Sequence, residues 1–290
     1  MVAEQNVERI FLGATFALLS FFCLALMGAF AKMASHYTTA SVLVFFQNAI
    51  SFVCILPIVF LSKTFTLKTS RLSMHIFRAV MGTGAWYGLF FSIAKIPLTT
   101  AILLTYSAPL WMAFFAWFLF GEKITFQVWL GIVIGFIGIM LVLNPIGSRF
   151  NIAMFFALAA AILLAFALFA VRWLGKTESI LSILFYYFLI SSLLVLPLAL
   201  LHWQTPLPVA WIYIFAIGLS LIISQAFIIL AYRFASPVSL GPYIYSVIIF
   251  SVLIDCVIWG HQLSQLEWLG IIFVIAGGFL SALKKKPITV

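Results

Sequence analysis

Arg78 and Asp255 are charged side chains inside long apolar stretches of the sequence, which makes them the first candidates for chemistry. A charge in apolar surroundings costs enough free energy that it usually serves in binding, proton transfer or an ion pair. Arg78 could bind a carboxylate or a phosphate, or its long stem could carry the guanidinium to the nearest polar surface. Asp255 could carry a proton, but we favour an ion pair with His261, which follows it closely in the sequence.

Other polar or aromatic side chains stand near the middle of apolar stretches: Trp86, Tyr87, Tyr106, Gln225 and Tyr245. Aromatic faces can hold a planar ring or a cation, and a phenol or an amide at that depth needs a partner or a wet cavity. For Tyr106 and Tyr245 we favour cavity lining over packing between helices. For Trp86, Tyr87 and Gln225 the two interpretations stay open. Together with Arg78, these five residues are our candidates for a substrate-binding cavity.

Catalysis is not indicated, because an enzyme needs acids, bases or metal ligands that converge. The histidines are instead scattered over several polar breaks: His36, His75, His202 and His261. There is no paired carboxylate, no His-x-x-x-Asp pattern and no CxxC motif, and the three cysteines fall within apolar stretches. A filter sequence typical of a channel is also missing. We therefore expect no enzymatic activity, no metal and no cofactor.

The apolar composition determines which elements hold these residues. Of the 290 residues, 66% are hydrophobic and only 7% charged, whereas a soluble domain carries about a quarter charged residues. The apolar segments are about 20 residues long, which suits helices that cross a bilayer and is too long for barrel strands. We expect ten transmembrane helices, at residues 10–31, 39–61, 73–94, 98–120, 126–143, 152–172, 179–201, 209–231, 238–259 and 266–283.

The net charge of +9 predicts orientation, and nucleic-acid binding is not needed to explain it. If the chain begins in the cytoplasm, twelve of the fifteen Lys and Arg residues lie on the inner side: Arg9, Lys63, Lys68, Arg71, Arg78, Lys123, Arg172, Lys176, Arg233, Lys284, Lys285 and Lys286. The other three are Lys32, Lys95 and Arg149. This positive-inside bias predicts a cytoplasmic-membrane protein with both termini in the cytoplasm. Lys32 and Arg172 end helices at matching positions and are expected to anchor them, with a gate as the alternative.

The chain repeats its own pattern after about 140 residues. The stretch GEKITFQVWLGI at 121–132 returns as GHQLSQLEWLGI at 260–271, and the pair Tyr106-Ser107 returns as Tyr245-Ser246. Five expected helices separate the two copies, and an odd number places the second copy upside down in the membrane. Such inverted repeats can open a shared central site to one side and then to the other. We therefore expect two inverted five-helix repeats, at residues 1–144 and 145–290.

The repeated strings also predict how the last helix of each copy begins and packs. Ser264 and Glu267 form the S-x-x-E pattern of a capping box at the start of the tenth helix. Gly131 and Gly135 have GxxxG spacing, which permits close approach of another helix. We expect that contact within the chain, with a homodimer as the alternative.

The doubled break followed by Trp-Leu-Gly-Ile, together with the break Ile96-Pro97-Leu98-Thr99, resembles the drug/metabolite transporter superfamily, in its EamA-type ten-helix branch. The resemblance covers essentially the whole chain. It implies a proton-linked or gradient-linked carrier or exchanger of small metabolites, with a cavity between helices 1, 3, 4, 6, 8 and 9. The second copy departs from the family pattern at Gly260-His261, where Gly-Glu is usual, and it lacks a counterpart of Pro109.

The resemblance implies a secondary carrier that moves a small organic molecule through the lipid bilayer by alternating access. Some members import S-adenosylmethionine, and others export amino acids or toxic compounds. Our leading expectation is an amino acid or an amino-acid derivative. S-adenosylmethionine is the specific alternative, because aromatic faces and few acidic side chains suit its sulfonium and its adenine. Export of a drug or toxic metabolite remains a further alternative.

Overall fold

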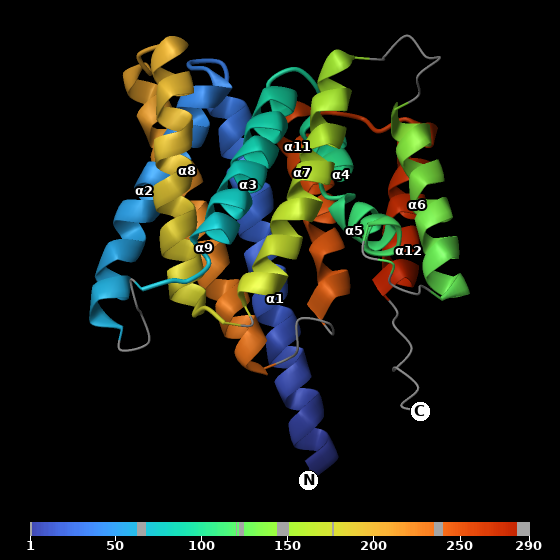
Figure 1. The fold of residues 1–290 in the computed structure, drawn as a ribbon. Coiled ribbons are helices and arrows are strands. Elements are labelled where there is room, and N and C mark those ends of the chain that lie inside the picture. Colours follow the sequence, from blue (N-terminus) through green and yellow to red (C-terminus); the bar gives the residue numbers. More distant parts are fainter. Residues whose placement is uncertain are drawn as a thin grey trace.

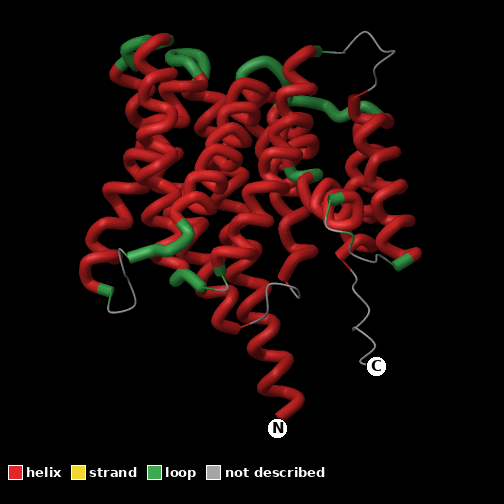
Figure 2. The backbone as a smooth tube through the Cα atoms, viewed as in Figure 1, coloured by secondary structure: helices red, strands yellow, loops and turns green. Residues whose placement is uncertain are grey.

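The computed structural model describes residues 2–62, 68–119, 121, 125–143, 151–175, 177–234 and 240–282. All regular structure within these ranges is helical, with no strand among them (Figure 2). The prediction of an all-α membrane protein is confirmed. The helices that form the first half of the chain are α1 (Val2–Ala34), α2 (Ala40–Leu61), α3 (Leu72–Ile93), α4 (Leu98–Thr105), α5 (Ala108–Phe118) and α6 (Phe126–Leu143).

The second half repeats this order. Its helices are α7 (Ile152–Leu174), α8 (Ile180–Leu201), α9 (Pro208–Phe234), the 3₁₀ helix η1 (Gly241–Tyr245), α11 (Ser246–Trp259) and α12 (Gln265–Ala282). Within the described ranges, eight helical segments are long and apolar enough to cross a membrane, if α4–α5 and η1–α11 each count as one. The other two predicted crossings are α3, which carries polar residues such as His75 and Arg78, and the shorter apolar helix α12.

The two halves run in opposite directions through the bundle (Figure 1). Helix α1 begins and α12 ends at one end of the bundle, which we call the terminal end. Helix α7, the counterpart of α1, begins at the opposite end, which we call the far end. The second five-helix unit is therefore inverted relative to the first, as the odd number of crossings predicts.

Helix packing follows the same symmetry. Helix α1 packs mainly on α9, and its counterpart α7 packs in the same way on α3, the counterpart of α9. Helices at matching positions of the two halves also pack together: α2 with α8, α6 with α12 and α4 with α11. The contacts of α1 with α11 and of α2 with α9 likewise have counterparts, in those of α7 with α4 and α5 and of α8 with α3. Exchanging the halves leaves this set of pairs unchanged, as expected for a two-fold axis in the membrane plane.

The fourth and ninth crossings are present but interrupted at matching positions. Helix α4 ends at Thr105 and α5 begins at Ala108, whereas η1 gives way to α11 between Tyr245 and Ser246. In the first case Pro109 follows the break, and its missing N–H leaves the carbonyl of Thr105 without the usual helical partner. Continuous helices over residues 98–120 and 238–259 were expected, and the breaks put the two tyrosine-serine pairs at irregular backbone.

The last crossings of the two halves touch through glycines. A Cβ at Gly138 would stand 2.7 Å from the carbonyl oxygen of Gly270, and one at Gly277 would meet the backbone of Gly131 and Gly135. The GxxxG face therefore packs on α12 of the same chain. At the start of α12, the backbone N–H of Ser264 donates to Oε2 of Glu267 at 2.8 Å, which confirms the capping box.

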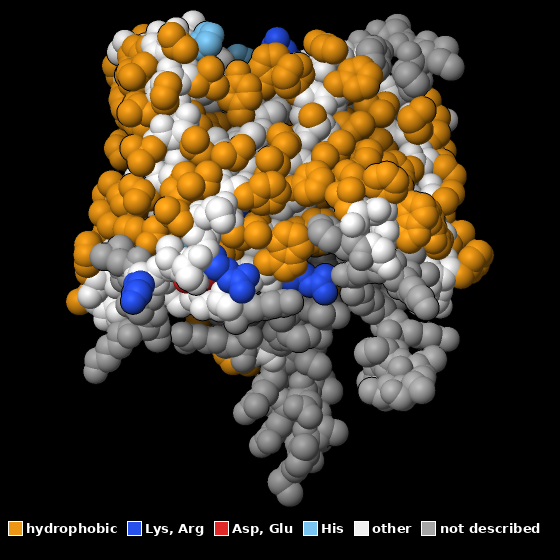
Figure 3. Space-filling view, viewed as in Figure 1, with side chains coloured by type: hydrophobic (Ala, Val, Ile, Leu, Met, Phe, Trp, Pro, Cys, Tyr) orange, Lys and Arg blue, Asp and Glu red, His pale blue; other side chains and the backbone are white. Residues whose placement is uncertain are grey.

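Side-chain chemistry changes along the height of the bundle. Apolar side chains cover the visible face between the two ends, and Lys and Arg gather toward the terminal end (Figure 3). Lys68 and Arg71 are exposed. Nine cations used for the orientation lie outside the described side chains: Arg9, Lys63, Lys123, Arg149, Lys176, Arg233, Lys284, Lys285 and Lys286.

Candidate functional site

A buried ion pair joins three helices near the far end. Nζ of Lys32, in the last turn of α1, lies 3.1 Å from Oδ1 of Asp255 in α11. Oδ2 of Asp255 accepts a hydrogen bond of 3.0 Å from the backbone N–H of Thr99, in the first turn of α4. The side chain of Asp255 is 1% exposed and that of Lys32 is 15% exposed, so the contact is almost closed to solvent.

The expected pair between Asp255 and His261 is wrong. Helix α11 ends at Trp259, and the left-handed φ of 61° at Gly260 turns the chain away, so the contact between Asp255 and His261 runs from the His261 N–H to the Asp255 backbone carbonyl. Nε2 of His261 lies 4.0 Å from Oε1 of Glu267 instead. Lys32 is 223 residues from Asp255 in the sequence, so local spacing could not reveal it.

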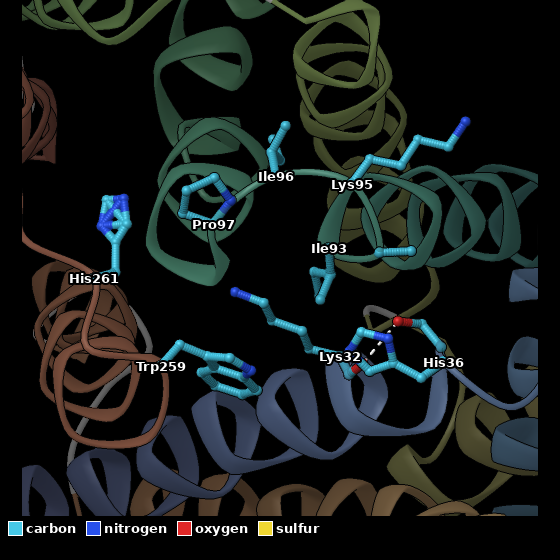
Figure 4. A pocket seen from close by; sticks show the side chains of 10 residues that line it. Lys32, His36, Ile93, Lys95, Ile96, Pro97, Trp259 and His261 are labelled. Atoms are coloured by element: carbon cyan, nitrogen blue, oxygen red, sulfur yellow. Dashed lines mark hydrogen bonds between the residues drawn. The ribbon is translucent and has the colours of Figure 1, made fainter. Parts of the chain in front are cut away.

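The ion pair lies at the edge of a far-end cavity of about 400 Å³. Its polar or aromatic lining residues are Lys32, Ser35, His36, Lys95, Trp259 and His261. Nζ of Lys32 reaches into the space between Pro97 and Trp259, whereas Lys95 points away from it (Figure 4). The same ammonium lies 4.3 Å from the centre of the Trp259 ring, a cation–π distance.

Two of the candidate binding residues meet in a second polar cluster, between α3 and α8. Nη1 of Arg78 donates a 2.8 Å hydrogen bond to the Ile183 carbonyl, and the guanidinium lies 4.4 Å from the centre of the Tyr187 ring. Trp86 lies beside the side chain of Tyr187. Gly82 makes room for that ring, because a Cβ there would stand 2.8 Å from it. Arg78 therefore points to α8.

Tyr87 and Gln225 lie elsewhere. Tyr87 follows Trp86, and the ~100° turn per helical residue points it to another face of α3, where it stacks on Phe91 with ring centres 6.5 Å apart. Gln225 lines a mainly apolar cavity of about 580 Å³ between α2, α8 and α9. Neither residue is part of the cluster around Arg78.

Tyr106 and Tyr245 mark the two helix breaks. They are 5% and 3% exposed, so both are buried at the irregular backbone of their crossings. The Tyr245 hydroxyl lies against Gly278 of α12 and has no hydrogen-bond partner among the described residues. The structure thus brings Arg78 and Trp86 together and places the two tyrosines at the positions where the crossings bend.

Sequence reasoning did not single out Tyr187 or the partnership of Lys32 with Asp255. Tyr187 and Ser191 stand one helical turn apart in an apolar segment, and two polar side chains on one face of such a helix indicate a polar contact inside the bundle. The position of Lys32 at a helix end predicts a surface anchor, because cations at helix ends normally reach the interface.

Two inverted five-helix units that enclose buried charged groups define a polytopic membrane carrier. Residues 11–144 and 151–283 each match the EamA-like transporter family. The chain belongs to this family, and it is a small-molecule transporter rather than an enzyme.

Proteins with similar sequences are named for different cargoes. The chain is 33% identical over 213 residues to an S-adenosylmethionine uptake transporter of Rickettsia felis, covering 72% of this chain and 71% of that protein. It is 26% identical over 276 residues to a pseudopaline exporter of Pseudomonas aeruginosa, covering 94% and 97%. A riboflavin transporter of Vibrio cholerae is 28% identical over 249 residues, covering 83% and 82%.

A solved crystal structure supports the fold. It covers 95% of this chain and 98% of its own, with a TM-score of 0.66 and 18% sequence identity. At that identity the likeness concerns the arrangement of the helices and carries no information about cargo.

Proposed function

We propose that this protein carries an amino-acid derivative with a planar ring, of the S-adenosylmethionine class, across the cytoplasmic membrane by alternating access. The proposal refines the broader expectation of an amino acid or derivative. Similarity to S-adenosylmethionine uptake transporters supports it, at 33% identity over 72% of the chain.

The observation that carries the proposal is the arrangement of Arg78 and Trp86 on α3. They are eight residues apart, which at 1.5 Å per residue is roughly 12 Å along the helix axis. Both contact Tyr187 on the facing helix α8, so they belong to one face of α3. A guanidinium suits a carboxylate at one end of the cargo. The indole and phenol rings suit a planar base or a sulfonium at the other end.

We propose that the other candidate residues line the route of the cargo through the bundle and are not part of the site around Arg78 and Trp86. Tyr87, Tyr106, Gln225 and Tyr245 lie on α3, at the two breaks and on α9. In our proposal the matched breaks at Tyr106 and Tyr245 are the points where the fourth and ninth crossings bend as access alternates.

We further propose that the terminal end faces the cytoplasm and the far end faces outward. The distribution of Lys and Arg, twelve against three in the sequence, supports this orientation. A boundary between residues 144 and 145 divides the two repeats, in agreement with the family matches at 11–144 and 151–283.

Uptake of labelled S-adenosylmethionine by intact bacterial cells that produce the protein tests the cargo. We expect saturable uptake, exchange with unlabelled S-adenosylmethionine, and weak competition by adenosine or methionine, each of which lacks one end of the molecule. Arg78→Gln is expected to raise KM at least about tenfold, the cost of one charge-assisted hydrogen bond. Lys68→Met, which removes an exposed cation at the terminal end, is the matched control.

Uptake no greater than that of cells without the protein, at equal surface expression of a folded carrier, would refute this cargo. Accumulation of S-adenosylmethionine inside inverted membrane vesicles, with no uptake by intact cells, would support the same cargo and the opposite direction of transport.

A further inference from the structure

The ammonium of Lys32 extends into the far-end cavity, which we call the vestibule. His36, Trp259 and His261 also line the vestibule, as does Lys95, whose side chain points away from it. The acidic side chains near the vestibule already have bonding partners. Asp255 is buried beneath Lys32, and Glu267, which lines an adjoining cavity, accepts two hydrogen bonds of 2.8 Å from Ser264. The vestibule therefore suits an anionic group on a molecule that enters from the far end.

Lys32 connects the vestibule with the buried carboxylate. Its ammonium has three N–H donors, and Asp255 lies 3.1 Å from the nitrogen on the closed side. The other side of the ammonium faces the vestibule and the Trp259 ring (Figure 4). A carboxylate in the vestibule could thus bind Lys32 before the contact with Asp255 breaks. Asp255 would then keep its hydrogen bond from the Thr99 N–H.

The two halves of the inverted repeat do not share this ion pair. The symmetry that relates the halves maps α1 and α11 at the far end onto α7 and α5. Asp255 corresponds, 139 positions earlier, to Ala116, whereas Lys32 corresponds to Arg172. The other half therefore has no carboxylate at the position that matches Asp255, and next to Ala116, Phe115 stacks on Phe166 of α7 with ring centres 4.9 Å apart.

We propose that the vestibule is a carboxylate-binding entry site, in which Lys32 transfers its ion pair from Asp255 to the carboxylate of the cargo and so frees α1 from α11. Because one carboxylate replaces another, Lys32 is never left without a counter-ion in a nearly closed site. This inference rests on the proposed function in one respect, namely that the cargo bears a carboxylate.

The test compares two labelled probes in intact cells: S-adenosylmethionine and its decarboxylated form, which keeps the adenine, the sulfonium and the amine. The wild type should favour the carboxylated probe by at least about tenfold in KM, equivalent to one charge-assisted contact. In the double variant Lys32→Met/Asp255→Asn, the KM for S-adenosylmethionine should rise about tenfold and that for the decarboxylated probe should change by less than about twofold, so that only the preference due to Arg78 is left. The control Lys68→Met should keep the wild-type ratio.

The outcomes separate the two proposals. If the double variant changes both KM values by the same factor, or changes neither, the vestibule assignment is overturned while the cargo stands. If the wild type takes up neither probe, the proposed function fails and this assignment fails with it.

A second measurement leaves the ion pair intact and so does not depend on folding of the double variant. Ile93, 1% exposed, lines the vestibule and can be replaced by Cys in a chain whose three native cysteines are Ser. Labelling of this thiol by an impermeant reagent should accelerate with S-adenosylmethionine and stay slow with the decarboxylated probe. Equal rates with the two probes would overturn the proposal.

Discussion

Removal of the Lys32 ammonium should destabilise the protein far more than removal of both charges of the ion pair. Lys32→Met leaves the Asp255 carboxylate, 1% exposed, with only the hydrogen bond from the Thr99 N–H. Breaking a buried pair in this way costs about 3–5 kcal/mol. In Lys32→Met/Asp255→Asn, the amide oxygen can still accept from Thr99 and the Met side chain can pack on Trp259. Replacement of a whole buried pair is often close to neutral, so we expect the double variant to lose less than about 1.5 kcal/mol.

The assay is a thermodynamic cycle of the wild type, the two single variants and the double variant, purified in one detergent. At roughly 2–4 °C per kcal/mol for domains of 150–250 residues, Lys32→Met should lower Tm by roughly 6–20 °C and the double variant by less than about 6 °C. Asp255→Asn should fall between them, because the Lys32 ammonium can turn toward the vestibule. If the double variant lost as much stability as the two single variants added together, the interaction energy would be zero, and the ion pair could not be what stabilises the far end.

Three further changes test individual contacts. Tyr245→Phe removes a buried hydroxyl with no described partner, so Tm should stay unchanged or rise; a fall of several degrees would show that the hydroxyl has a partner. Gly277→Val places a side chain against the backbone of Gly131 and Gly135, so α6 and α12 should separate and the monodisperse fraction of the protein in gel filtration should fall sharply. The control Gly28→Ala meets only the flexible ends of side chains, so its monodisperse fraction should match that of the wild type. Ser264→Ala removes the capping hydroxyl and should cost about 1 kcal/mol, seen as a small loss of Tm; no loss would contradict a role of the box in starting α12.

The sequence predicts the crossings and their inversion because both depend on local properties. Segment length and hydropathy determine which stretches cross the bilayer, and the repeat offset with an odd number of crossings determines that the halves are inverted. The capping box at Ser264 and Glu267 is equally local, since the two residues are three positions apart. The breaks near Tyr106 and Tyr245 were not predicted. Their segments remain apolar throughout, and Pro109 alone does not say whether a helix bends or stops.

The candidate site was harder to predict, because its contacts join distant parts of the chain. Arg78 was found as a charge in an apolar segment, but its contacts with Ile183 and Tyr187 depend on how α3 and α8 pack. Asp255 was found in the same way and assigned to His261, the nearest base in the sequence. The partner in the fold is Lys32, because α1 and α11 meet at the far end. A single sequence identifies which buried charges need partners, and the topology decides which partners they receive.

Inverted repeats give the two ends of this carrier the same helix pairs, but not the same chemistry. The far end joins α1 to α11 through Lys32 and Asp255, whereas the matching pair of α7 and α5 meets through Phe115 and Phe166. Separation of the aromatic contact costs hydrophobic burial whatever the cargo carries. Separation of the ion pair depends on whether another anion can take the place of Asp255. In the proposed mechanism the far end therefore adds a second contact to the cargo carboxylate beside that of Arg78, and selectivity for carboxylates should be greater for entry from the far end than for entry from the terminal end.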